Sequence, residues 1–331
     1  MKVVNIVLSG GVGSRLWPLS RKTFPKQYIE LFEGKSLFEM TLQRNVAMAN
    51  ERVIVGNKDN VHLSQQVLDK VALDAISIVE VSPRNTAAAI AFAALAVAPE
   101  TIMVVTPSDH IIENQVAYKS AIDTAKSLAA AGNLVTFGVV PTYPETGYGY
   151  IESEGDNVIS FREKPNLTLA KEFLASGNYL WNSGMFCFRS DVFLNELLSL
   201  SPDIYKAVMN VWNNKLDDGM FSETLTALIP NISVDVAVME NSKKIKVVPA
   251  TFKWSDLGSF ESLYDYLKNQ GTPVDNFGNM CIGNELPTYF VGLENVIVVS
   301  TKDVNLVLQK EAAQDVKKVY EYISVNNSEL I

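Results

Sequence analysis

Residues 8–27, LSGGVGSRLWPLSRKTFPKQ, decide the fold prediction, because a glycine-rich loop here directly follows a short apolar run. The run, Val3–Leu8, is typical of a buried strand. Three glycines fall within four residues: Gly10, Gly11 and Gly13. A loop without side chains lets backbone N–H groups close on a phosphate, and the cations of Arg15 and Lys26 flank it. The stretch therefore predicts a nucleotide polyphosphate site.

Two better-known phosphate loops do not match this stretch. A Walker A loop needs Lys-Ser or Lys-Thr after its last glycine, and none follows here. A dinucleotide fingerprint needs a third glycine where the chain has Leu16. Pro18 and Pro25 stiffen the segment by fixing φ. The plainer alternative is a glycine-rich turn with basic residues on the surface.

Composition limits the class of protein. The chain has 331 residues, 47% of them hydrophobic, which suits one large domain with an appendage or two domains. No stretch approaches the ~20 apolar residues of a membrane span, and the chain begins with a strand rather than a signal peptide. Cys187 and Cys281 offer no disulfide framework. We expect a cytoplasmic protein without membrane partners, and the net charge of −9 argues against nucleic acid.

The first 140 residues alternate strand-like and helix-like patterns. The expected strands are 52–55, 75–81, 101–106 and 133–139, and the expected helices are 36–49, 61–70, 86–98 and 117–131. Ser36 and Glu39 form a capping-box pattern at one helix start. The alternation predicts an α/β fold of Rossmann-like type, with a mixed, mainly parallel sheet flanked by helices. The glycine loop and residues 107–110 follow two of these strands and should share one sheet edge.

The later sequence is richer in β structure. We expect a hairpin over 148–163, strands over 179–189 and 244–248, a small β unit over 276–308 and a closing helix over 311–323. The predicted domains are a catalytic domain, 1–268, and a small C-terminal β-helix-like domain with its terminal helix, 269–331.

Two aspartates suggest a metal site. Asp109 and Asp256 each come just after a predicted strand, although they are far apart in the sequence. Mg²⁺ prefers oxygen ligands and usually takes one or two carboxylates together with substrate phosphates. Each aspartate alone fits a helix or turn cap better. Combined with the glycine loop, the pair predicts a Mg²⁺ site, whereas the neighbouring His110 is expected to be structural.

The opening stretch resembles the signature of the sugar-1-phosphate nucleotidylyltransferases and, within them, of the mannose-1-phosphate guanylyltransferase branch. Six further strings resemble successive motifs of that branch, in order: VEVSPRNTAAAIAFAAL (79–95), TPSDH (106–110), TGYGYIE (146–152), EKP (163–165), WNSGMF (181–186) and WSDLGSF (254–260). With the opening stretch they cover about residues 1–260.

The resemblance implies roles for these positions. On the catalytic side, Arg15 and Lys26 would offset phosphate charge, and Asp109 and Asp256 would hold Mg²⁺. The residues implied for GTP are Leu8, Gly10, Gly11, Gly13, Glu80, Asn85, Thr86 and Ser108. The residues implied for mannose 1-phosphate are Gly147, Glu163, Lys164 and Asn182. The implied reaction is a direct in-line transfer of GMP to the sugar phosphate, driven by positioning and electrostatics. Family precedent also makes a homodimer plausible.

Three departures from the family pattern qualify this prediction. Glu80 is followed by Val81, and Pro83 precedes Arg84, where the family commonly has Glu-Pro. Many bacterial relatives continue into a phosphomannose-isomerase domain of the cupin type, so we expect a single-activity form without isomerase activity. The β unit over 276–308 is shorter than the left-handed β-helix of the family.

Three other functions stay open. A related transferase would use another base or sugar, such as dTTP or UTP with glucose 1-phosphate or GTP with a heptose phosphate. A nucleotide-sugar sensor could dispense with Arg15, Lys26 or one aspartate, yet all four are present. A nicotinamide-dependent oxidoreductase disagrees with Leu16 and with the lack of an acidic residue at the end of the second strand.

Overall fold

The computed structural model describes residues 1–331 except 32–33, 217–218 and 284–285. The predicted β unit over 276–308 contains residues 284–285, so that part of it lies outside the described residues. The chain divides into two compact units. The first unit comprises Met1–Gly10, Thr41–Ser108 and Ile112–Trp254, and the second comprises Gly11–Met40, Asp109–Ile111 and Ser255–Ile331.

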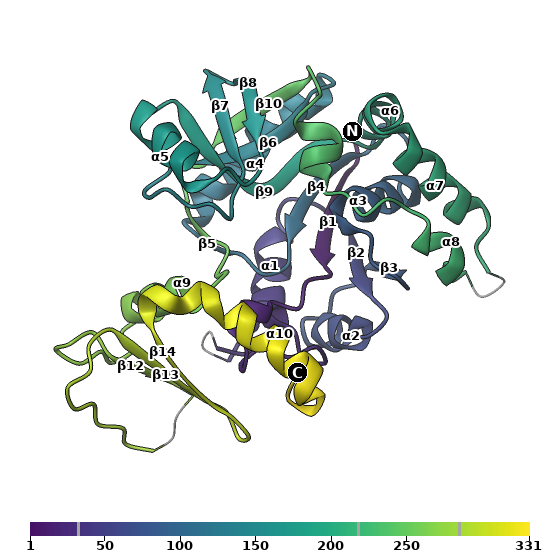
Figure 1. Ribbon diagram of the computed structural model, residues 1–331. Helices are drawn as coiled ribbons and strands as arrows, with labels where there is room; N and C mark the ends of the chain where they lie inside the picture. The colour runs from purple at the N-terminus through teal and green to yellow at the C-terminus, as the bar shows by residue number, and fades with distance from the viewer. Residues whose placement is uncertain (32–33, 217–218, 284–285) are drawn as a thin grey trace. The chain divides into compact units, whose positions relative to one another are not determined.

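The first unit is built on a nine-stranded sheet of order β3-β2-β1-β4-β9-β6-β10-β8-β7 within the described chain (Figure 1). Its strands are β1 (Val3–Ser9), β2 (Glu51–Asn57), β3 (Ile76–Glu80), β4 (Ile102–Pro107), β6 (Leu134–Val139), β7 (Tyr150–Glu154), β8 (Asn157–Arg162), β9 (Tyr179–Arg189) and β10 (Ile245–Pro249). All the strands predicted from the sequence in this part of the chain are present, with ends shifted by a few residues.

The sheet is mixed, but the prediction that it is mainly parallel is wrong. Strand β1 runs parallel to β2 and β4, β2 to β3, and β6 to β10. The long strand β9 runs antiparallel to β4, β6 and β7, and the hairpin β7–β8 continues antiparallel onto β10. The apolar pattern of β9 suits either direction, because a strand buried on both faces is apolar throughout.

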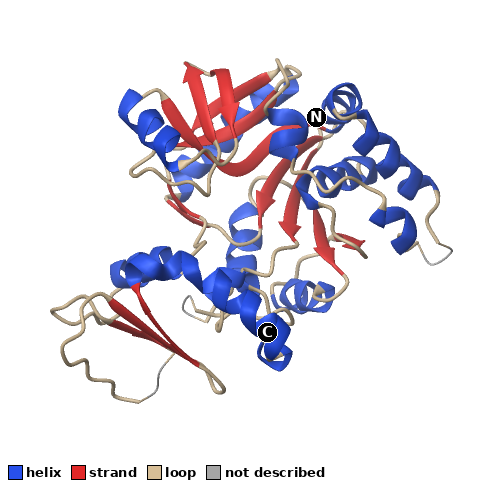
Figure 2. Cartoon of the chain, viewed as in Figure 1, coloured by secondary structure: helices blue, strands red, loops and turns tan. Residues whose placement is uncertain are grey.

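Helices cover both faces of this sheet (Figure 2). They are α2 (Val61–Lys70), α3 (Asn85–Ala96), α4 (Gln115–Ala130), α5 (Leu167–Ser176), α6 (Ser190–Leu200), α7 (Pro202–Asn213), α8 (Glu223–Ala227) and the π-helix η3 (Asp235–Met239). Because side chains alternate along a strand, Ile6 and Val105 pack with α3, whereas Val104 packs with α4 on the other face. In α3 every residue from 87 to 94 is at most 6% exposed, so this alanine-rich helix is buried on all sides.

The second unit has its own core. Its elements are η1 (Ser14–Leu16), η2 (Lys26–Tyr28), α9 (Phe260–Asn269), β12 (Met280–Ile282), β13 (Val296–Ser300), β14 (Asn305–Gln309), η4 (Lys310–Asp315), α10 (Val316–Asn326) and η5 (Ser328–Leu330). Strand β13 pairs parallel with β12 and antiparallel with β14. Leu16 and Trp17 pack with Phe260, Ile297 and Ile323. The signature stretch is thus part of the same core as the C-terminal helix.

Three short elements lie where the chain passes between the units: α1 (Leu37–Asn45), β5 (Ile111–Glu113) and β11 (Lys253–Ser255). The start of α1 follows the predicted capping pattern, since the backbone N–H of Glu39 donates to Ser36 Oγ at 3.2 Å. Among the described residues, no helix is both long and apolar enough to span a lipid bilayer.

Candidate active site

The carboxyl ends of β1 and β4 lie next to each other. The two strands pair in parallel with Leu8 opposite Pro107, and the N–H of Ser108 donates to the carbonyl of Leu8 at 3.0 Å. The glycine loop and the segment after β4 therefore start from one sheet edge, as predicted. A Cβ built on Gly10 or Gly11 would meet no described atom within 4 Å, so the backbone is open to a close approach there.

Lys26 ties together the segments of both predicted metal ligands within the second unit. Its side chain is 8% exposed, and its ammonium lies 2.8 Å from Asp109 Oδ2. The same ammonium donates to the backbone carbonyls of Asp256 at 2.7 Å and Leu257 at 3.3 Å. An ammonium has three N–H donors. All three are therefore used by protein oxygens, and a phosphate can bind Lys26 only by replacing one of them.

Asp109 is ionised in this environment. Burial acts to raise its pKa, but the charge of Lys26 and then the neighbouring His110 act against burial, so the pKa lies below the ordinary value. His110 is buried, with Nε2 3.8 Å from Asp109 Oδ1. The carboxylate side chain is still 29% exposed, so a cation can approach it.

Asp256 lies after β11, in a tight turn whose neighbour Leu257 has a positive φ of 44°. Its Oδ1 accepts the backbone N–H of Gly258 at 3.0 Å. A Cβ on Gly258 would lie 2.5 Å from Asp256 Oδ2, so a side chain there would displace the carboxylate. Lys26 contacts the carboxylate of Asp109 and the backbone of Asp256, and carboxylates are the hard oxygen ligands that Mg²⁺ takes together with phosphates. Groups of three or more His, Cys, Asp and Glu able to hold a metal do not occur among the described residues.

Gly13 and Arg15 shape the loop itself. Gly13 has φ of 75°, and a Cβ there would lie 2.6 Å from Cβ of Lys26, so any side chain would push the lysine away. The carbonyl of Gly13 accepts Ser20 Oγ at 2.6 Å, which fixes the turn. Arg15 is half-buried, and its guanidinium makes no hydrogen bond or ion pair within the described part of the chain. It is thus available to an anion.

The residues predicted for the base lie in the first unit, at the end of β3 and the start of α3. Glu80 is 4% exposed, and its Oε1 has no hydrogen-bond partner among the described residues. Burial raises the pKa of Glu80 to about 7, against the backbone N–H of Arg84. Asn85 adopts a left-handed φ of 69°, and its Oδ1 accepts the N–H of Thr86 at 2.9 Å. The structure thus leaves a buried carboxyl oxygen beside the first turn of α3.

The residues predicted for the sugar also lie in the first unit. Glu163 Oε1 pairs with Lys164 Nζ at 2.5 Å, and Glu163 Oε2 is buried without a partner in the described structure. Asn182 is 9% exposed and lies in β9. The N–H of Gly147 donates to Glu145 Oε1 at 2.7 Å, which folds the loop before β7 back on itself.

Asp235 is a polar group at this site that the sequence did not reveal. Its Oδ1 accepts a hydrogen bond from Asn182 Nδ2 at 2.8 Å. It lies 53 residues beyond Asn182 in the segment SVDVAVM, which has no recognisable motif, so only the fold brings the two together.

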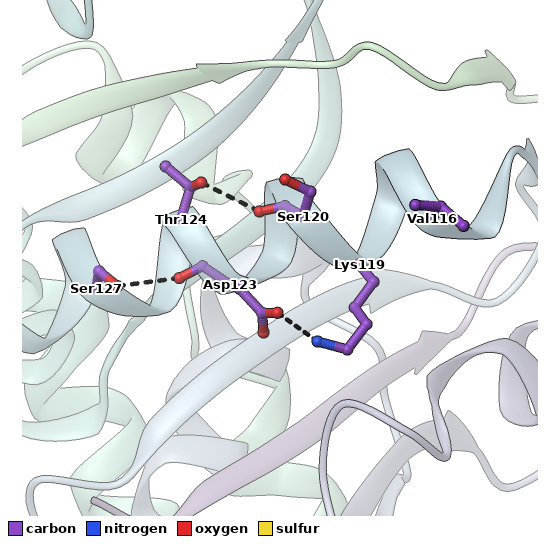
Figure 3. A pocket seen from close by; sticks show the side chains of 6 residues that line it. All are labelled: Val116, Lys119, Ser120, Asp123, Thr124 and Ser127. Atoms are coloured by element: carbon purple, nitrogen blue, oxygen red, sulfur yellow. Dashed lines mark hydrogen bonds and ion pairs between the residues drawn. The ribbon is translucent and has the colours of Figure 1, made fainter.

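The surface pocket in Figure 3 contains none of these residues. It lies along one side of α4 and is lined by Val116, Lys119, Ser120, Asp123, Thr124 and Ser127. Lys119 pairs with Asp123 at 2.5 Å, and the hydroxyls of Thr124 and Ser127 donate to carbonyls one turn earlier, as the dashed lines show. These polar groups bond one another within the helix, and nothing in the pocket is arranged to bind a ligand.

Comparison with known proteins defines the class first. Residues 4–271 match the family model for nucleotidyl transferases, and residues 272–322 match the model described as a MannoseP isomerase/GMP-like beta-helix domain. A mannose-1-phosphate guanylyltransferase of Salmonella muenchen is 38% identical over 98% of this chain and 74% of its own length. The alginate biosynthesis protein AlgA of Pseudomonas syringae is 39% identical over 96% of this chain and 71% of its own.

A solved structure agrees with the sequence comparison. It is a Thermus thermophilus protein described as a mannose-1-phosphate geranyltransferase, with a TM-score of 0.85 and 29% identity over 98% of this chain and all of that one. This chain therefore belongs to the mannose-1-phosphate guanylyltransferase family of nucleotidyltransferases.

Proposed function

We propose that this enzyme transfers GMP from GTP to α-D-mannose 1-phosphate and releases GDP-mannose and pyrophosphate. The observation that carries this proposal is the Lys26 cluster, in which one buried ammonium joins Asp109 to the Asp256 segment beside a glycine loop. The named guanylyltransferase of Salmonella muenchen supports the choice of GTP and mannose 1-phosphate.

The triphosphate is proposed to bind the glycine loop. Backbone N–H groups of Gly10, Gly11 and Gly13 donate to phosphate oxygens, because no side chain blocks them. Arg15, which has no partner in the described structure, offsets charge on the α-phosphorus and on the departing pyrophosphate. Lys26 also binds the triphosphate, by exchanging one of its three protein oxygen partners for a phosphate oxygen.

Mg²⁺ is the proposed cofactor, and Asp109 with Asp256 would hold it. When bound, the ion neutralises phosphate charge and orients the triphosphate. The pKa of Asp109 lies below its ordinary value, so this carboxylate is ionised and ready to bind a cation at neutral pH.

Guanine recognition is proposed for residues 80–86, with Leu8 and Ser108 also on the nucleotide side. The Watson–Crick edge of guanine has adjacent N1–H and N2–H donors, and the unpartnered oxygen of Glu80 can accept from it. Asn85 and Thr86 follow Glu80 in the sequence and form the start of α3. Val81 and Pro83 stiffen this loop differently from the family pattern, so the base preference is the part most in need of a direct test.

The sugar phosphate is proposed to bind Gly147, Glu163, Lys164 and Asn182. Glu163 has two acceptor oxygens, which suit sugar hydroxyls, and Lys164 suits the phosphate. The attacking phosphate oxygen is already ionised at neutral pH and needs no general base. It forms a bond to the α-phosphorus of GTP as the bond to the pyrophosphate oxygen breaks in line, without a covalent enzyme intermediate.

A pyrophosphate-release assay tests this proposal. GTP with mannose 1-phosphate should give the highest kcat/KM among GTP, ATP, UTP and dTTP, each paired with mannose 1-phosphate, glucose 1-phosphate or a heptose phosphate. A better rate with another pair would identify a related transferase, and binding without turnover would identify a sensor. Asp109→Ala and Asp256→Ala should each lower turnover by orders of magnitude, and near-normal Mg²⁺-dependent activity in both would disprove the metal assignment.

The proposal includes a division into a catalytic domain, 1–268, and a C-terminal domain, 269–331. The change of matched family model at residues 271–272 supports it, whereas the two compact units place residues 11–40 with the C-terminal part. Relatives described as alginate and xanthan biosynthesis proteins support a role in supplying an activated sugar for polysaccharide synthesis.

A further inference from the structure

Asp235 lies in a network that fixes Asn182 in one orientation. Asn182 Nδ2 donates to Asp235 Oδ1 at 2.8 Å. On its other side, Asn182 Oδ1 accepts Thr136 Oγ1 at 2.9 Å and the N–H of Gly184 at 3.2 Å. Because both ends of the amide have partners, Asn182 is held in place, and Asp235 is part of what holds it.

The same network borders a buried carboxyl oxygen. A Cβ built on Gly149 would lie 2.6 Å from Glu163 Oε2 and 3.4 Å from Cβ of Asn182, so both residues face this glycine closely. Glu163 Oε2 has no hydrogen-bond partner among the described residues, although it is buried. A buried acceptor without a donor is costly, so a ligand hydroxyl that reached Glu163 Oε2 would be bound favourably.

Asp235 shares this desolvated environment with Glu163. Burial and then the negative charge of Glu163 together raise the pKa of Asp235 to about 7, against Lys164 and the hydrogen bond from Asn182. Asp235 begins the π-helix η3, a type of helix that is rare and occurs often at functional sites. The preceding residue is fixed as well, because the N–H of Val234 donates to Thr86 Oγ1 at 2.9 Å.

We propose that Asp235 is a specificity-determining ligand of the sugar, which binds a ring hydroxyl together with Glu163 Oε2 beside Asn182. This inference rests on the proposed function, because it deepens the sugar site of the same reaction. A hydroxyl placed between two carboxyl groups can donate to the ionised one, and it can accept a hydrogen bond from the other when that one is protonated. An epimer with that hydroxyl moved leaves the buried Glu163 Oε2 without a partner, and a site of this kind discriminates strongly.

The test compares Asp235→Asn with Ser233→Ala. Ser233 Oγ accepts the N–H of Val236 at 3.4 Å, so its removal loosens the same helix without touching the sugar residues. Asp235→Asn should raise KM for mannose 1-phosphate about tenfold or more, with KM for GTP changed less than about twofold. The ratio of kcat/KM between mannose 1-phosphate and whichever of its C2, C3 and C4 epimers has that hydroxyl moved should fall, whereas Ser233→Ala should keep this ratio.

Deoxy sugar phosphates identify the hydroxyl. For one deoxymannose 1-phosphate, removing the hydroxyl should lower kcat/KM of the wild-type enzyme about as much as Asp235→Asn lowers kcat/KM for mannose 1-phosphate. When the Asp235→Asn variant is given that same analogue, its kcat/KM should fall little further. Equal changes in both KM values, or a lower Tm with an unchanged epimer ratio, would show that Asp235 is only structural. Calorimetric Kd values for mannose 1-phosphate give the same comparison without turnover. If wild-type enzyme prefers another sugar phosphate, the proposed function fails, and the variants are compared on that sugar.

Discussion

Replacing Lys26 with methionine is expected to destabilise the second unit by about 3 kcal/mol. Methionine keeps the aliphatic stem that packs against Gly13 but removes the ammonium, and with it the contacts to Asp109 and to two carbonyls. Breaking a buried ion pair by removing one partner costs about 3–5 kcal/mol. We take the lower end, because Asp109 is 29% exposed and water can replace part of the interaction.

Urea denaturation at pH 7 measures this loss, with Lys22→Met as the matched control from an exposed position of the same segment. Asp109→Asn and the double variant complete a double-mutant cycle, and the coupling energy should lie between about 0.5 and 3 kcal/mol. Because the pKa of Asp109 in the folded protein lies below its ordinary value, its ionised carboxylate stabilises the fold when the pH is above that ordinary value. This stabilisation is lost as the pH falls through the pKa of Asp109 in the folded protein. The gap between wild type and Lys26→Met should therefore narrow below about pH 4. Additive single effects, or a Lys26→Met protein as stable as the Lys22→Met control, would refute the reasoning.

Three further changes test other parts of the structure. The pKa of Glu80 is raised to about 7, so between about pH 4.5 and 7 the folded protein keeps a proton that the unfolded chain releases. The free energy of unfolding should therefore fall as pH rises through this range. In thermal denaturation between pH 4 and 8, Glu80→Gln should remove up to about 3 kcal/mol of this fall. Gly149→Ala should lower the free energy of unfolding by about 1–3 kcal/mol and raise KM for the sugar phosphate, because the new Cβ would lie 2.6 Å from a carboxylate oxygen. Gly56→Ala is the control: its Cβ would have its nearest contact at 3.7 Å, so both effects should be smaller. Trp17→Phe should lower the free energy of unfolding in urea by about 1 kcal/mol, because the 2.7 Å hydrogen bond from the indole N–H to the carbonyl of Leu330 is lost. An unchanged free energy of unfolding would show that this bond contributes nothing.

Local sequence patterns predicted the elements well, because their causes are local. Apolar runs predicted strands such as β4 and β6, and helical spacing predicted α2 with the bounds that the structure shows. The direction of β9 could not be predicted in this way. A strand buried on both faces carries no mark of its neighbours' direction, and β9 pairs antiparallel with partners from well before it in the chain.

Some residues of the candidate site could likewise be predicted from the sequence, and others could not. Asp109 and Asp256 could be proposed from chemistry and position, and the structure adds that Lys26 contacts the side chain of one and the backbone of the other. Asp235 could not be proposed, because it reaches the site through a contact with Asn182, 53 residues away in sequence, and no motif surrounds it. The saturation of Lys26 by three oxygens was equally invisible, since it depends on two carbonyl positions that no residue type encodes.

The burial of α3 has a practical consequence for changing which nucleotide the enzyme accepts. A helix whose residues 87–94 are at most 6% exposed has no free side on which to shift or tilt, so the first turn that carries Asn85 and Thr86 is held in a fixed position. A library that varies α3 would mostly yield proteins that fail to fold. A library confined to residues 80–84, which lie before the helix, would alter the segment proposed to bind the base and leave the helix that supports it intact.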